Sequence, residues 1–270
     1  MVHVTGKQNT AKNERRMSGE KYTAFIFDLY GTLVDIRTNE EKPGLWRKLS
    51  EIYSSLGAHY SPAELKKIYF LMLRNTDEHV QAQGVRNYGE SFLGEVDLTA
   101  VFQSLFHEQD VACSRERAAL IANLFRMFSR ERLKVYAGVE ETLDRLRKMG
   151  KKVFLLSNAQ SDFTRPEIEL LGLTEYFDGI MISSEEGCRK PSPVFFKRLT
   201  ERYGLMPENC LMIGNDVNTD IRGAETVGMD TLYIHTETSP QLIGKPDATY
   251  AVPDGNWHKA AKILLEAAKM

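Results

Sequence analysis

The chain has 270 residues, of which 42% are hydrophobic and 27% charged, and its formal net charge is −2. This balance lacks the basic excess of a nucleic-acid-binding protein, and no apolar run approaches the roughly 18 residues that span a bilayer. The three cysteines stand far apart, which favours reduced thiols in a cytoplasmic protein over a disulfide framework or a zinc site.

The first 20 residues are polar, which predicts a disordered tail rather than a secretory signal. Residues 22–27 form a short apolar run that ends in Asp28 and a turn at Gly31, as expected of a buried strand. Comparable runs return at residues 151–159, 179–186, 210–216 and 231–236. They show no strict alternation of apolar and polar residues, which indicates parallel strands that are covered on both faces.

Helical patterns lie between or after these runs, at residues 139–150, 191–204, 221–228 and 256–270. Strands that alternate with helices predict an α/β fold with a doubly wound parallel sheet. In such sheets ligands bind at the carboxyl ends of the strands.

Residues 42–133 break this alternation, because they show helical periodicity without a buried-strand run. Ser61 and Glu64 match a capping box, and Ser114 is a second expected helix start. The charged run at residues 129–134 is expected to be a solvated helix end. We therefore predict a helical cap domain inserted in the α/β core, with the cap at residues 37–134 and the core at residues 21–36 and 135–270.

Four of the predicted strands end in, or lead directly into, a cluster of polar side chains. They are Asp28, then Ser157 and Asn158, then Lys190, and finally Asp216 with Asp220. Because parallel strands end at one edge of their sheet, we expect these side chains to converge. Carboxylates that meet at one point repel one another, and a hard divalent cation relieves this repulsion. The candidate Mg²⁺ ligands are Asp28, Asp216, Asp220 and the backbone carbonyl of Tyr30.

The remaining polar groups suit a phosphoryl ligand. The ammonium of Lys190 and the hydroxyl of Ser157 can bind phosphoryl oxygens, and Asn158 and Thr32 are further candidates for substrate binding. A carboxylate beside a metal is a plausible nucleophile, so Asp28 is expected to form an aspartyl-phosphate.

Four segments of the chain, FDLYGTLVD, LLSNA, GCRKPSPVFF and GNDVNTDIRGA, resemble the four ordered motifs of the haloacid dehalogenase (HAD) superfamily. The resemblance spans roughly residues 23–236, and the helical insert after the first motif matches the branch with a cap in that position. It implies that Asp28 is the nucleophile, that Ser157 and Lys190 bind a phosphoryl or carboxylate group, and that the metal is held by Asp216 and Asp220.

Tyr30 departs from the phosphatase pattern of this superfamily. Its phosphatases usually carry an aspartate two residues after the nucleophile as general acid and base, whereas its dehalogenases often carry tyrosine there. Those dehalogenases work without metal and usually lack the carboxylates of the fourth motif. Without a metal, Asp216 and Asp220 would weaken Asp28 as a nucleophile, because unpaired like charges raise pKa values. We therefore expect a Mg²⁺-dependent phosphatase for a small phosphorylated metabolite, with Tyr30 as a candidate catalytic proton donor.

Two alternatives remain open, a metal-independent 2-haloacid dehalogenase and a weakly active or regulatory binding protein with this fold. A monomer and a homodimer are equally compatible with the sequence, and neither nucleic acid nor membrane is an expected partner. Candidate substrate contacts near the entry to the predicted cap are Arg37, Asn39 and Trp46.

Overall fold

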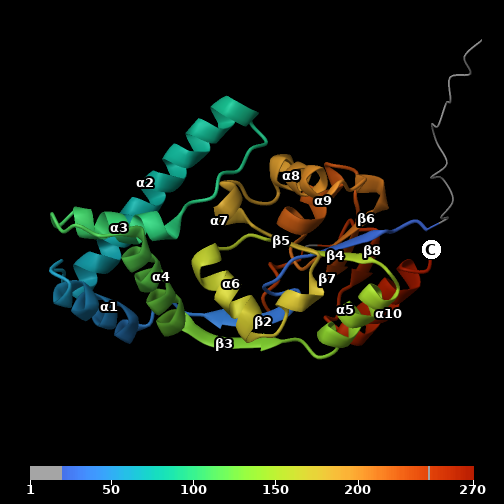
Figure 1. Cartoon of the computed structure of the whole chain (residues 1–270), viewed down its shortest axis with the longest axis horizontal. Helices are drawn as coiled ribbons and strands as arrows, with labels where there is room; N and C mark the ends of the chain where they lie inside the picture. Colours follow the sequence, from blue (N-terminus) through green and yellow to red (C-terminus); the bar gives the residue numbers. More distant parts are fainter. Residues whose placement is uncertain (1–19, 243) are drawn as a thin grey trace, which may run out of the picture.

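The computed structural model describes residues 20–242 and 244–270 (Figure 1). The predicted tail at residues 1–20 therefore lies, apart from Glu20, outside the described residues. Helices α1 to α4 gather at one end of the molecule, and the large sheet with its flanking helices forms the other end (Figure 1).

The sheet has six parallel strands in the order β5-β4-β1-β6-β7-β8. In chain order they are β1 (Ala24–Phe27), β4 (Lys152–Ser157), β5 (Gly179–Ile182), β6 (Cys210–Gly214), β7 (Asp230–Ile234) and β8 (Tyr250–Val252). Strand β1 is central, and all four of its residues are buried. This explains its continuous apolar run, because both faces of the sheet are covered. The predicted doubly wound parallel sheet is confirmed, although the three-residue β8 was missed.

The helices of the core cover both faces of this sheet. One apolar cluster includes residues of α5, α6 and α10, and another, on other strand residues, includes residues of α8 and α9. Their bounds are α5 (Val139–Lys148), α6 (Ser161–Leu170), α8 (Pro193–Tyr203), α9 (Arg222–Glu225) and α10 (Trp257–Ala267). The short elements are α7 (Ser183–Glu186), 3-10 turns at Thr174–Tyr176 and Pro207–Asn209, and a π-helical turn at Val217–Ile221. Helix α6 was not predicted from the sequence.

The remaining helices build an apolar cluster of their own. They are α1 (Pro43–Ser55), α2 (Pro62–Tyr88), α3 (Leu98–His107) and α4 (Arg115–Ser129). Their cluster contains Trp46, Tyr69, Phe102 and Phe125 and no strand residue of the sheet. The predicted helix starts are confirmed, because Ser61 and Glu64 form a reciprocal capping box and Ser114 accepts a hydrogen bond from an amide of the first turn of α4. The bounds of the predicted cap domain stay a prediction.

Residues 130–134 of the charged run belong to a strand, so the expected helix end is wrong beyond Ser129, the last residue of α4. Strand β3 (Arg130–Val135) pairs antiparallel with β2 (Val34–Thr38), and Arg132 Nη1 lies 3.0 Å from Asp35 Oδ2. The ladder satisfies the backbone polar groups while Glu131, Arg132 and Lys134 stay exposed, which explains why the polar composition disguised a strand. This ribbon carries both chain crossings between the sheet and α1 to α4.

A second connection runs through the segment between α2 and α3. Phe92 is buried in the apolar cluster that includes α8. The amide of Glu95 donates to the Gly187 carbonyl at 3.2 Å, and the amide of Arg189 donates to the Leu93 carbonyl at 2.9 Å. The segment from the helical end therefore pairs with the residues directly before Lys190.

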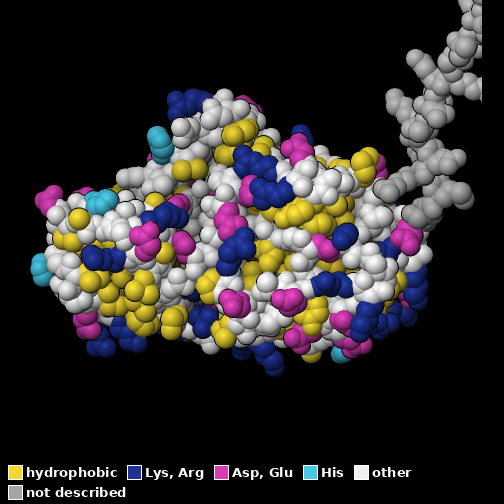
Figure 2. All heavy atoms as spheres, in the orientation of Figure 1, with side chains coloured by type: hydrophobic (Ala, Val, Ile, Leu, Met, Phe, Trp, Pro, Cys, Tyr) yellow, Lys and Arg dark blue, Asp and Glu magenta, His cyan; other side chains and the backbone are white. Residues whose placement is uncertain are grey.

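The surface in Figure 2 carries basic and acidic side chains interspersed, in accord with the near-neutral net charge. No helix among residues 20–242 and 244–270 is long and apolar enough to cross a membrane. All three cysteines are buried free thiols.

Candidate active site

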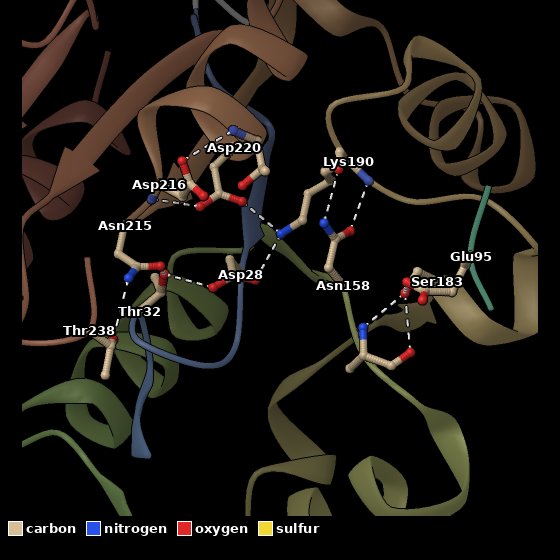
Figure 3. Close-up of polar contacts among 12 residues, drawn as sticks. Asp28, Thr32, Glu95, Asn158, Ser183, Lys190, Asn215, Asp216, Asp220 and Thr238 are labelled. Carbon is tan, nitrogen blue, oxygen red and sulfur yellow. Dashed lines mark hydrogen bonds and ion pairs between the residues drawn. The ribbon is translucent and has the colours of Figure 1, made fainter. Parts of the chain in front are cut away.

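The predicted convergence of polar side chains at the strand ends is present in the structure. Figure 3 shows Asp28, Lys190, Asp216 and Asp220 turned toward one another at the carboxyl ends of β1 and β6 and the loop before α8. All four line one cavity of about 250 Å³, together with Tyr30, Ile36, Asn158, Asn215, Thr219, Thr238 and Pro240.

Lys190 holds two carboxylates together. Its Nζ donates to Asp28 Oδ1 and to Asp220 Oδ1, each at 2.7 Å. Burial alone would lower the pKa of Lys190, but the charges of Asp220 and Asp28 raise it above its usual value. The pKa of Asp220 is raised to about 6, because burial and the charge of Asp28 together outweigh the opposing charge of Lys190. The ammonium is therefore retained, and negative charge is in excess around it.

The turn after β6 explains how Asp216 and Asp220 come together. Asp216 caps the following π-helical turn, since its Oδ1 accepts from the amides of Asn218 at 2.7 Å and Thr219 at 3.3 Å. Asp220 lies one turn later, and its side chain points back toward Asp216, so that Asp220 Oδ2 accepts a hydrogen bond from the Asp216 amide at 3.0 Å. A β-carbon at position 214 would overlap the side chain of Asp220, so Gly214 permits this approach.

The other predicted binding residues differ in what their polar atoms contact. Thr32 Oγ1 donates to Asp28 Oδ2 at 2.9 Å and thus orients this carboxylate. Asn158 and the backbone of Lys190 exchange two hydrogen bonds, at 2.8 and 3.0 Å, which fix the lysine loop. Ser157 Oγ is buried and has no hydrogen-bond partner among the described residues. Such a hydroxyl costs free energy unless a ligand satisfies it.

The donor set suits a divalent cation. The lining of the cavity includes three carboxylates and one ammonium, which leaves negative charge uncompensated. Within the described ranges no three Asp, Glu, His or Cys side chains are placed to hold a metal unaided. Mg²⁺ usually needs only one or two carboxylates beside waters and substrate phosphate. Asp28, Asp216 and the Tyr30 carbonyl would meet that requirement, with Asp220 as a further carboxylate of the cavity. Both oxygens of Asp28 and both oxygens of Asp220 also accept hydrogen bonds from the protein.

The hydroxyl of Tyr30 has a partner that the sequence did not suggest. It donates to Glu167 Oε2 on α6 at 2.5 Å and lies 3.1 Å from Thr164 Oγ1. Burial raises the pKa of Tyr30, and the charge of Glu167 raises it further. The expected proton donor, in the loop after β1, thus directs its proton to a buried carboxylate on α6. No motif marks Glu167, since α6 carries none of the four segments.

Glu167 also binds two arginines at the junction with α4. Arg126 donates two hydrogen bonds to the Glu167 carboxylate, of 2.8 and 3.0 Å, and Arg130 Nη1 donates a third to Glu167 Oε1 at 3.0 Å. The Arg126 guanidinium lies 5.0 Å from the centre of the Tyr30 ring. Burial alone would raise the pKa of Glu167, but the hydrogen bonds and charge of Arg126 hold it below its usual value.

We expect Glu167→Gln to lower the free energy of unfolding by about 3 kcal/mol at pH 7, because it leaves the partly buried Arg126 without its counter-charge. A carboxyl with a lowered pKa contributes its stability above the unfolded value of ~4.3 and loses it as the pH falls. Urea unfolding of both proteins at pH 7 and in acid measures this. A difference that stays constant on acidification would contradict the assigned charge.

The three candidate substrate contacts near the entry of the insert are not part of the cavity lining. Arg37 is exposed and pairs with Glu131 at 3.1 Å. The Asn39 side chain accepts from the Glu41 amide at 2.9 Å. Trp46 is buried among the aromatic rings of α2 and α4. The structure gives these three residues no place in the cavity, because chain proximity to the first motif does not set side-chain direction, and Ile36 lines the cavity instead.

Comparison with known sequences gives one family and several relatives. A sequence profile of haloacid dehalogenase-like hydrolases matches residues 22–228. The phosphoserine phosphatase of Thermus thermophilus is 31% identical over 126 residues, which cover 47% of this chain and 50% of that relative. The glyceraldehyde 3-phosphate phosphatase of Pyrococcus furiosus is 34% identical over 101 residues, covering 37% and 42%. The matched stretches thus span half or less of these relatives.

Solved structures agree over nearly the whole chain. A 2-haloacid dehalogenase from Pseudomonas syringae has a TM-score of 0.58 at 18% identity, covering 90% of this chain and 98% of that one. A HAD phosphatase from Thermococcus onnurineus has a TM-score of 0.51 at 21% identity, covering 90% and 97%. At such identities the likeness establishes the fold, and the fold alone does not choose between the two chemistries.

Proposed function

Because the chain belongs to the haloacid dehalogenase-like hydrolase family, we propose that it is a Mg²⁺-dependent phosphatase of a small phosphorylated molecule. The observation that carries this proposal is the cluster of Asp28, Asp216 and Asp220 around one buried lysine. A dehalogenase gains from a free nucleophilic carboxylate, and further unpaired carboxylates beside it would be a penalty. In a phosphatase, a divalent cation on Asp28 and Asp216 and the ion pair of Lys190 with Asp220 would account for all three carboxylates.

The proposed reaction has two steps. An oxygen of Asp28 attacks phosphorus, and the bond from phosphorus to the leaving oxygen breaks with its electron pair on that oxygen. Water then attacks the aspartyl-phosphate, which releases inorganic phosphate and restores the carboxylate. Thr32 fixes the nucleophile, and Lys190 with the unpartnered Ser157 hydroxyl binds phosphoryl oxygens. Mg²⁺ held by Asp28, Asp216 and the Tyr30 carbonyl would neutralise phosphoryl charge.

We place the rest of the substrate between the core and α2. A second cavity of about 500 Å³ there is lined by Phe70, Leu73 and Arg74 of α2 and by Gln160 and Arg189 of the core. The last two stand within two residues of Asn158 and Lys190 in the chain, respectively. The predicted cap would thereby select the leaving group and exclude water.

The test measures phosphate release from p-nitrophenyl phosphate with and without Mg²⁺, and chloride release from 2-chloropropionate in a separate reaction. We expect phosphate release that requires Mg²⁺ and disappears with chelator. Chloride release that is insensitive to chelator would overturn the proposal in favour of the dehalogenase. Release of neither product would favour a binding role.

A further inference from the structure

A leaving group that is unstable as an anion must be protonated as it departs. The proton donors of the cavity therefore decide which phosphorylated substrates react. Such a donor contributes roughly 10²- to 10⁴-fold in rate. Among the described residues that line the cavity, the groups carrying an acidic proton are Lys190, the phenol of Tyr30, and any carboxyl in its protonated form.

Lys190 is unsuited to this task. Its ammonium is the shared partner of Asp28 and Asp220, each at 2.7 Å. If it gave up a proton, two buried carboxylates would face each other without a counter-charge. Asp220 is no substitute, because both of its oxygens accept hydrogen bonds, from Lys190 and from the Asp216 amide. Asp216 is no substitute either, because its Oδ1 accepts two backbone hydrogen bonds and the carboxylate is a proposed ligand of the cation.

Tyr30 is unsuited for a different reason. Its hydroxyl points to α6, where Glu167 accepts the proton at 2.5 Å. Transfer of that proton to a substrate would create a phenolate directly beside a carboxylate that two arginines already hold ionised. The buried Glu167 therefore keeps the Tyr30 hydroxyl in place and keeps its proton from the substrate.

We infer that this site acts on phosphates whose leaving group departs as a stable anion: acyl phosphates, and phosphates of acidic phenols or enols. The inference rests on the proposed phosphatase function. In the first step the Asp28 oxygen bonds to phosphorus, and the leaving oxygen departs with the electron pair as a carboxylate, phenolate or enolate. No proton is needed at that point, so the missing donor costs little rate.

The experiment is a leaving-group series with Mg²⁺: acetyl phosphate, p-nitrophenyl phosphate, phenyl phosphate and ethyl phosphate, with Asp28→Asn as the blank for spontaneous hydrolysis. We expect kcat/KM to fall steeply along this series, by roughly 10²- to 10⁴-fold between the first two members and ethyl phosphate. Tyr30→Phe should keep the same slope, because the hydroxyl is not the donor. A flat series, or a Tyr30→Phe loss confined to ethyl phosphate, would overturn the inference.

Tyr30→Asp and the matched Tyr30→Asn test the same point by restoring a donor. The aspartate variant should gain about 10²-fold on ethyl phosphate over the asparagine variant, with no gain on acetyl phosphate. Equal rates of the two variants on ethyl phosphate would count against the inference. If no member of the series releases phosphate, the proposed function itself fails, which is a different result from a flat series.

Discussion

We expect Asp28→Asn to abolish phosphate release, with kcat lower by between roughly 10⁴- and 10⁶-fold, because the covalent nucleophile is removed. The amide keeps the shape of the carboxylate but cannot form the acyl phosphate. The structure predicts that this loss is not an effect of unfolding. Asp28 and Asp220 share one ammonium, so removing one of the two negative charges relieves repulsion in the buried cluster.

The variant should therefore unfold at a temperature no lower than that of the wild type, which calorimetry can check. Asp144→Asn is the matched control, because the same chemical change falls on a half-exposed residue of α5 whose ion pair, among the described residues, is with Lys148. Its rate should stay within about twofold, since exposed pairs of this kind contribute little. Substantial phosphate release by Asp28→Asn would remove this residue from the proposed role.

Lys190→Met is expected to cost both stability and activity. Methionine fills a similar volume, but it leaves Asp28 and Asp220 buried without a counter-charge. Loss of one partner of a buried ion pair typically lowers the free energy of unfolding by about 3–5 kcal/mol. Removal of one group that stabilises transition-state charge typically lowers kcat by about 10²- to 10³-fold. Urea unfolding and phosphate release measure the two effects.

A second substitution separates stability from catalysis. Asp220→Asn added to Lys190→Met removes one of the two unpaired charges, so it should recover stability without recovering rate. Lys197→Met on α8 is the matched control, because Lys197 is exposed and lies outside the cavity. If the free energy of unfolding of Lys190→Met lies within about 1 kcal/mol of the wild-type value, the shared ion pair does not stabilise the fold as proposed.

The sequence alone determined the parallel sheet and the candidate site at its edge. Apolar runs of four to six residues mark buried strands wherever both faces are covered, and the first polar residue after each run marks its end. Since parallel strands end at one edge of the sheet, the sequence predicted that Asp28, Lys190 and Asp216 lie close together. The structure places them in one cavity. The helix starts at Ser61 and Ser114 could also be predicted from the sequence, because capping involves residues that are three positions apart in the chain.

Only the tertiary structure decided which distant partner each side chain found. Tyr30 and Glu167 are 137 residues apart, and their hydrogen bond depends on how α6 packs against the first loop. The β2 and β3 strands carry polar residues whose pairing comes from backbone ladders, which leave little trace in composition. The spacing of apolar residues in the sequence indicates which side of a helix or strand is buried. It does not indicate which residue of another element packs there, because that depends on how the elements pack together.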